Sequence, residues 1–319
     1  MSELLRIDKL SACYQGHQED TLKEIDLSLS RGKIIGLVGE SGCGKTTLLK
    51  AVIGCDLHGL RITGGKIQFE GKNLQEISDL EYRKLLGNEI GFIVQDSISA
   101  LNPIKKIKYQ IQELLWEKQR IRKKQAYEMG KNMLLRLHCP EDTMEKYPFQ
   151  MSGGQRQRVI IAMAFLLAPK ILLADEPTTA LDVTIQAQIL KEMLELRDSY
   201  QTGILLISHN LGVVSQVADE IGVMYGGRIV EYGSAVQILK APGHPYTQAL
   251  IRCIPDIHYP RGQRLYHIRD TRIYKGEESG GCCFAERCDK CSDLCRKTAP
   301  PVVWQEGGWV ACHLSDSTM

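Results

Sequence analysis

The sequence predicts an α/β fold built on a parallel sheet, followed by a smaller module that is rich in cysteine. Continuous apolar runs, which are typical of buried parallel strands, are each followed by a turn and a helical pattern. A glycine-rich phosphate-binding motif lies directly after the first of these runs. Of the 11 cysteines, six fall between Cys282 and Cys312, so the composition changes sharply near the C-terminal end.

Composition and charge exclude several classes of protein. With 43% hydrophobic and 24% charged residues among 319, the chain has enough apolar material for a packed core. The 40 basic and 38 acidic side chains give a net charge of +2, which offers no broad surface for nucleic acid or anionic lipid. The best apolar run, 159–168, is shorter than the about 20 residues that span a bilayer. The N-terminus lacks a secretion signal, so the cysteines are expected in a reducing cytosol, as ligands or buried apolar residues.

Five segments are predicted to be strands. Residues 4–9 and 24–30 alternate apolar and polar side chains, which is typical of antiparallel strands with one solvated face. Residues 34–38, 171–174 and 204–207 are continuously apolar, as expected of parallel strands that are covered on both faces.

Four segments are predicted to be helical. Residues 46–53, 184–200 and 211–217 each follow one of the buried strands, which is the layout of an α/β sheet with crossovers. Residues 106–137 are rich in Lys, Gln, Glu and Leu at helical spacing, and they are predicted to form an inserted helical subdomain.

Residues 39–46 fit the P-loop pattern G-x-x-x-x-G-K-[ST], between a predicted strand and a predicted helix, which is the context that the motif requires. Its glycines let backbone N–H groups point at the β- and γ-phosphates, while Lys45 adds positive charge and Thr46 ligates Mg²⁺. The predicted nucleotide-binding residues here are Gly39, Glu40, Ser41, Gly42, Cys43, Gly44, Lys45, Thr46 and Thr47.

Two carboxylates, Asp175 and Glu176, follow the apolar run 171–174. A P-loop needs an acidic metal ligand at the end of a neighbouring strand, and Asp175 fits the Mg²⁺ shell. Glu176 is expected to orient or deprotonate the attacking water, a role typically worth about 10²–10⁴ in rate.

Several further motifs carry a family resemblance. Residues 150–158, QMSGGQRQR, resemble the signature sequence of ATP-binding cassette (ABC) ATPases, with Ser152, Gly153, Gly154 and Gln155 at its centre. Other pieces match the family in the expected order: Tyr14 resembles the adenine-stacking aromatic residue, Gln95 the Q-loop glutamine, Thr179 to Asp182 the D-loop, and His209 the switch histidine.

The resemblance implies an ABC-type P-loop ATPase domain, with a RecA-like core, an antiparallel β subdomain and an inserted helical subdomain that carries the signature. It also implies a dimer that binds ATP and Mg²⁺, in which the helix beginning at Ser152 faces the γ-phosphate on a second subunit's P-loop. In this arrangement His209 contacts the γ-phosphate near Glu176. Asp182 belongs to the nucleotide site, and Gln95 links Mg²⁺ to the transmembrane partner.

Three segments are similar to one branch of the family, the oligopeptide, dipeptide and nickel importers. They are residues 95–103 (QDSISALNP), residues 243–250 (GHPYTQAL) and the cysteine-containing segment 281–314. The resemblance implies two domains: an ABC ATP-binding domain over residues 1–255 and, over residues 256–319, a C-terminal cysteine-rich extension of the oligopeptide/dipeptide transporter type.

Four cysteines of this extension, Cys282, Cys288, Cys295 and Cys312, have the spacing C-x5-C-x6-C-x16-C. Cytosolic thiols this close together favour a metal site. The spacing lacks the paired C-x2-C units of a zinc ribbon, and the family resemblance implies a [4Fe-4S] cluster, with Zn²⁺ or no metal as alternatives. Cys291 is an alternative ligand, because it lies between the second and third cysteines. A redox sensor that gates the ATPase is a further hypothesis for the same thiols.

The function implied by the resemblance is that of the ATP-hydrolysing subunit of an importer, bound peripherally to the cytoplasmic face of the plasma membrane. Its expected partners are a second ABC ATPase subunit, for which the branch favours a paralogue, two transmembrane permease subunits and an extracytoplasmic substrate-binding protein. Peptides are the first expected cargo, and nickel or a metal chelate is the alternative. A soluble ABC ATPase acting on nucleic acid or ribosomes is disfavoured, because the chain holds one cassette and no broad basic surface.

Overall fold

The computed structural model describes residues 3–54, 59–95, 100–178, 181–254, 266–268 and 280–318. They form two compact units. Unit 1 comprises residues 1–6, 28–34 and 67–207, and unit 2 comprises residues 7–27, 35–66 and 208–319. The predicted boundary after residue 255 lies outside the described residues, so the division into domains 1–255 and 256–319 stays a prediction.

The centre of unit 1 is a set of parallel strands, with β7 (Ile171–Asp175) between β6 (Ile90–Ile93) and β8 (Gly203–Ser208). Leu172 lies opposite Gly91 on one side and Ile204 on the other. Residues 171–174 are 0% exposed, so both faces of β7 are covered. This confirms the prediction of buried parallel strands at 171–174 and 204–207.

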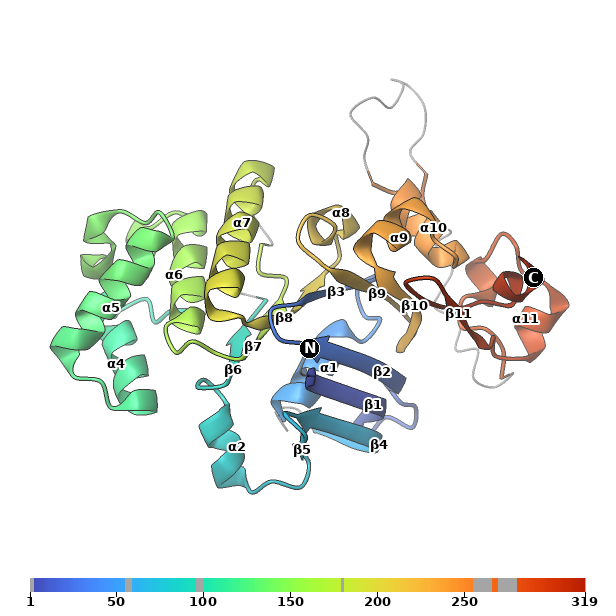
Figure 1. Ribbon diagram of the computed structural model, residues 1–319, viewed down its shortest axis with the longest axis horizontal. Helices are drawn as coiled ribbons and strands as arrows, with labels where there is room; N and C mark the ends of the chain where they lie inside the picture. The colour runs from blue at the N-terminus through green and yellow to red at the C-terminus, as the bar shows by residue number, and fades with distance from the viewer. Residues whose placement is uncertain are drawn as a thin grey trace. The chain divides into compact units, whose positions relative to one another are not determined.

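Helices of unit 1 form the predicted helical subdomain. As Figure 1 shows, α4 (Ile107–Gln119) and α5 (Lys123–Arg136) lie beside α6 (Gly153–Phe165). The next helix, α7 (Val183–Tyr200), is joined to α6 by an ion pair between Arg158 and Glu192 at 3.0 Å. Smaller elements of this unit are β5 (Lys72–Asn73), α2 (Asp79–Leu85) and the 3₁₀ turns Glu141–Glu145 and Pro148–Gln150.

Three long strands contribute residues to both units: β1 (Glu3–Tyr14), β2 (Leu22–Ser30) and β4 (Leu60–Phe69). The strand order in their sheet is β2-β1-β4-β5. The two segments with alternating polarity, 4–9 and 24–30, lie within β1 and β2, which confirms that they are strands.

Unit 2 contains the P-loop strand β3 (Ile34–Val38), which pairs in parallel with β9 (Glu220–Tyr225). The antiparallel neighbour of β9 is β10 (Arg228–Ser234), which it reaches through a two-residue turn. The turn residues Gly226 and Gly227 have φ of 55° and 83°, a left-handed conformation that glycine adopts without strain. The predicted helix after the P-loop is α1 (Lys45–Ile53).

The C-terminal part of unit 2 adds a hairpin that the sequence analysis did not predict. Its strands are β11 (Val302–Gln305) and β12 (Gly308–Ala311), and β12 pairs with β10, placing Trp309 opposite Tyr232. The resulting strand order within the unit is β11-β12-β10-β9-β3. The remaining helices of unit 2, most of them labelled in Figure 1, are α8 (Leu211–Val214), α9 (Ala235–Lys240), α10 (Pro245–Arg252), α11 (Asp293–Lys297) and the 3₁₀ turns Ala285–Arg287 and His313–Thr318.

The bounds of α8 test one expectation about helices. The helix predicted over 211–217 is shorter in the structure, because α8 ends at Val214. Among the described residues, no helix has both the length and the apolar character needed to cross a membrane.

Candidate functional site

The P-loop wraps tightly between β3 and α1 in unit 2. A Cβ atom at Gly39 would lie 2.1 Å from the carbonyl oxygen of Met224 on β9, so only glycine allows this approach. Gly42 and Gly44 have φ of 82° and 106°, which again favours glycine. Gly44 is the N-cap of α1, so the first N–H groups of that helix are directed toward the loop. The local structure is therefore that of an anion-binding loop.

Lys45 is held inside this loop. Its side chain is 6% exposed, and Nζ donates hydrogen bonds to the carbonyl oxygens of Gly39 and Glu40, both at 2.8 Å. The neighbouring Cys43 thiol lies 3.6 Å from the same ammonium group, and burial raises its pKa. The loop thus places one buried positive charge among backbone groups, which suits a polyanionic ligand.

Other predicted nucleotide contacts in unit 2 lie near the start of α1 or after β8. The Tyr14 hydroxyl is 3.2 Å from Oγ1 of Thr47, so the predicted adenine-stacking residue reaches the first turn of α1. His209 is exposed and follows β8.

The predicted metal and water-activating residues lie in unit 1. Asp175, at the end of β7, is 3% exposed. Glu176 has a φ of 47°, an uncommon value for a residue with a side chain, and its N–H donates to the Ile207 carbonyl at 2.9 Å. Nε2 of Gln95 donates to Oε2 of Glu176 at 3.3 Å. The structure therefore brings Gln95 and Glu176 together, a contact that the sequence analysis did not predict.

The signature residues begin helix α6. Ser152 is its N-cap: Oγ accepts a hydrogen bond from the Gln155 N–H at 3.3 Å, and the Ser152 N–H donates to the Gln155 side chain at 3.1 Å. Asp182 has the same role for α7, accepting from the Ile185 N–H at 3.0 Å. The polar signature and D-loop side chains therefore also fix where two helices start.

Gly154 lets α6 pack closely against α7, because a Cβ there would lie 2.9 Å from Cγ2 of Ile185. Replacing Gly154 with alanine is expected to lower the free energy of unfolding by about 1 kcal/mol relative to the same change at Gly153. At Gly153 the added Cβ would meet Leu181 at an ordinary 3.4 Å. Urea unfolding of both variants tests this packing, and equal stabilities would show that Ile185 moves aside without cost.

The predicted site residues thus form two groups. The P-loop, Tyr14 and His209 belong to unit 2, while Gln95, the two acidic residues, the signature and Asp182 belong to unit 1. Contacts that join the groups, such as that between His209 and Glu176, stay predictions. Thr179 and Ala180 of the predicted D-loop and residues 96–99 of the Q-loop segment lie outside the described residues.

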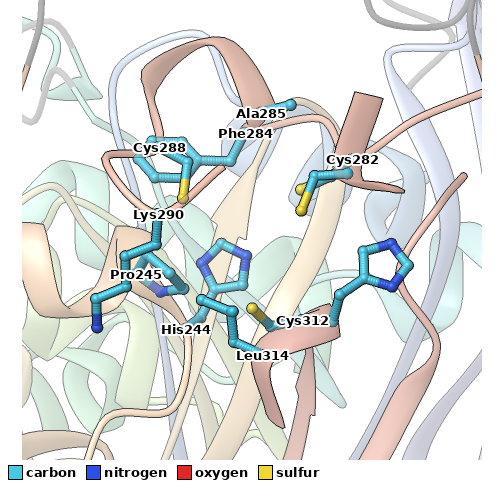
Figure 2. A pocket seen from close by; sticks show the side chains of 11 residues that line it. His244, Pro245, Cys282, Phe284, Ala285, Cys288, Lys290, Cys312 and Leu314 are labelled. Carbon is cyan, nitrogen blue, oxygen red and sulfur yellow. The ribbon is translucent and has the colours of Figure 1, made fainter. Parts of the chain in front are cut away.

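Four of the six C-terminal cysteines line a small cavity of about 10 Å³ in unit 2 (Figure 2). It is lined by all four predicted ligands, Cys282, Cys288, Cys295 and Cys312, whereas Cys291 is not among its lining residues. His244 and His313 also line it, although neither was predicted to be a site residue. The sequence could have pointed to His244, because this residue lies in the segment 243–250 that resembles the oligopeptide, dipeptide and nickel importers.

The pKa of several thiols of this cavity is raised, so their protons are held more tightly than on an ordinary thiol. A hydrogen bond with Cys283, together with burial, raises the pKa of Cys282 to about 12, and burial raises the pKa of Cys288 to about 11. A metal would have to displace these protons in order to bind. Among the described residues, no group of three or more His, Cys, Asp or Glu side chains is arranged to hold a single metal ion.

Comparison with known proteins decides the family. Residues 22–179 match the model of the ABC transporter family, and residues 230–295 match the C-terminal region of oligopeptide/dipeptide transporters. The dipeptide transport ATP-binding protein DppD of Escherichia coli strain K12 is 39% identical over 97% of this chain and 96% of its own length. The chain belongs to the ABC transporter family.

Other relatives of this ABC protein support the same family assignment. The oligopeptide transport ATP-binding protein AppD of Bacillus subtilis strain 168 is 38% identical over 98% of this chain and 97% of its own length. Among solved structures, the dimeric ATP-binding cassette MJ0796 bound to ADP and Pi has a TM-score of 0.65 at 24% identity, over 73% of this chain and 99% of that one, which shows a shared fold. The predicted family and its activity, ATP hydrolysis, are confirmed.

Proposed function

We propose that this chain hydrolyses ATP to power the uptake of dipeptides or oligopeptides. The observation that carries the proposal is the extent of similarity: 38–39% identity to dipeptide and oligopeptide transport proteins covers 97–98% of the chain, including the C-terminal region at 230–295. The partners are then two permease subunits, an extracytoplasmic peptide-binding protein and a second ABC ATPase, a paralogue of this one. The chain works at the cytoplasmic face of the membrane.

In this proposal, the P-loop binds the ATP phosphates. Its residues 39–47 surround the triphosphate, Lys45 transfers its hydrogen bonds from loop carbonyls to phosphate oxygens, and Tyr14 stacks on adenine. Bound Mg²⁺ would neutralise charge on the β- and γ-phosphates, held by Thr46, Asp175 and Gln95. These residues supply the hard oxygen donors that Mg²⁺ prefers.

Glu176 orients and deprotonates the attacking water in the same proposal. The hydrogen bond from its N–H to the Ile207 carbonyl fixes the main chain of Glu176 at the end of β7, and the Gln95 amide donates to its carboxylate. His209 contacts the γ-phosphate. The other side of the nucleotide is covered by a partner ATPase, through its counterparts of Ser152, Gly153, Gly154, Gln155 and Asp182.

Purification from native membranes on an affinity tag carried by this chain tests the proposal. We expect two integral membrane subunits and a second ATPase to copurify, with an ATPase rate that rises when peptide and its binding protein are added. Copurification with nucleic acid or ribosomes, without membrane subunits, would contradict it. Stimulation by nickel but not by peptide would reassign the cargo.

We also propose that Cys282, Cys288, Cys295 and Cys312 hold a [4Fe-4S] cluster. Their placement around one cavity supports this ligand set, and Cys291 lies outside it. In such a cluster each thiolate binds a different iron, so the four sulfurs need not converge on one point. The four thiols are the donor set of such a cluster, and the cavity, whose volume of about 10 Å³ has room for about one water, must widen to admit it.

Iron and sulfide analysis of anaerobically purified protein tests the cluster. About four irons and matching sulfide per chain are expected, with visible absorption. Cys288→Ser should lower the iron content sharply, whereas the matched change Cys291→Ser should leave it unchanged. One zinc per chain without visible absorption would replace the cluster with a structural zinc site. Equal iron loss in both variants would overturn the assigned ligand set.

A further inference from the structure

Within unit 2, an ion pair joins the P-loop to the cysteine module, the segment from Cys282 to Cys312. Arg287, one residue before Cys288, donates to both carboxylate oxygens of Glu40, at 2.6 and 2.8 Å. The Arg287 side chain is 7% exposed and that of Glu40 is 32% exposed. Glu40 is the second residue of the P-loop motif. The pair therefore bridges two segments that are 247 residues apart.

Buried aromatic side chains surround this pair. The Tyr225 hydroxyl lies 3.3 Å from Nη1 of Arg287, and the Tyr246 hydroxyl accepts a hydrogen bond from the Glu40 N–H at 2.9 Å. The ring of Phe284, from the cysteine module, lies 5.2 and 5.3 Å from those of Tyr225 and Tyr246. Both the backbone and the side chain of Glu40 are thus held by groups outside the P-loop.

Glu40 also touches the P-loop lysine, because its carbonyl oxygen accepts from Nζ of Lys45 at 2.8 Å. One residue therefore connects Arg287 to the positive charge that is expected to bind phosphate. The Glu40 carboxylate carries a negative charge beside that site. While Glu40 is paired with Arg287, its charge is neutralised and its carboxylate is directed toward the cysteine module. Without Arg287, the unpaired carboxylate would repel the triphosphate.

We propose that Arg287 is a positioning residue for ATP binding, through which the C-terminal cysteine module sets the nucleotide affinity of the cassette. The inference rests on the proposed nucleotide site at the P-loop. A planar guanidinium fixes a carboxylate through two parallel bonds, which a lysine ammonium cannot reproduce. Arg287 therefore controls both the charge and the orientation of Glu40.

ATP binding and turnover by the complex carrying variant chains test this role. Arg287→Ala should raise the Kd and KM for ATP about tenfold, because it removes a charge-assisted pair, while kcat changes little. Arg287→Lys should recover only part of the affinity. Adding Glu40→Gln to Arg287→Ala should restore affinity, because it removes the repelling charge. A merely structural role would not produce that rescue.

Arg296→Ala is the matched control. Arg296 pairs with Glu286 at 2.5 Å within the same module, and both side chains are well exposed. It should bind ATP like the parent chain. If Lys45→Ala binds ATP normally, the nucleotide site itself is wrong. If Lys45→Ala loses ATP while Arg287→Ala binds normally, or if Glu40→Gln gives no rescue, the role of Arg287 is overturned and the nucleotide site stands.

Discussion

Replacing Glu176 with glutamine is expected to lower the ATPase rate by about 10²–10⁴, with ATP affinity kept within a few fold. Glutamine preserves the shape of the side chain and a hydrogen bond with Gln95, but it cannot accept a proton from water. The left-handed backbone at Glu176 and its bond to Ile207 are unaffected by the change. Since the closed dimer would then form without hydrolysis to reopen it, the variant and its partner ATPase should accumulate as an ATP-bound dimer, measurable by gel filtration.

Glu195→Gln is the control for this experiment. Glu195 is an exposed acid on α7 of the same unit, so losing its charge should leave turnover unchanged. Undiminished hydrolysis by the Glu176 variant would remove this residue from the reaction. A parallel loss of ATP affinity would mean that Glu176 acts in binding instead.

Replacing Lys45 with alanine is expected to weaken ATP binding about 100-fold. The buried ammonium is the positive charge that the loop offers to phosphate, and charge-assisted hydrogen bonds of this kind contribute roughly 1.5–3 kcal/mol each. The change also removes the two bonds from Nζ to loop carbonyls. Binding of a fluorescent ATP analogue, with its competition by ATP, measures the loss.

Lys50→Ala provides the matched comparison, because Lys50 lies in the last turn of the same helix and is partly exposed. Its affinity for ATP should equal that of the parent chain. Equal weakening in both variants would indicate that α1 has been destabilised rather than that a phosphate contact has been lost.

Local patterns account for most of what the sequence predicted correctly. Continuous apolar runs predicted the buried strands at 171–174 and 204–207. The glycine-rich motif predicted the helix that follows the P-loop. Each of these signals lies within the segment itself or next to it. The β11–β12 hairpin was missed although Val302–Gln305 and Gly308–Ala311 flank a Glu-Gly turn. Its decisive feature, pairing with β10, depends on residues far away in the chain.

The contacts around the P-loop also depend on residues that are far apart in the chain, so the sequence did not predict them. Nothing local to Arg287 indicates that it pairs with Glu40, because the two lie 247 residues apart and each resembles a solvated charge in sequence. The cysteine site was predicted in part from the sequence. The resemblance to the importer branch, together with the cysteine spacing, singled out four residues, but only the folded chain shows that Cys291 is not among the residues that line their cavity.

Peptide uptake by the purified complex tests the central claim most directly. The complex, isolated through this chain and reconstituted into liposomes with ATP on the cassette side, should accumulate a labelled dipeptide or oligopeptide in the presence of the binding protein. Uptake should stop when the chain carries Glu176→Gln. ATP hydrolysis without peptide movement, or uptake of nickel in its place, would contradict the assignment of this chain to peptide import.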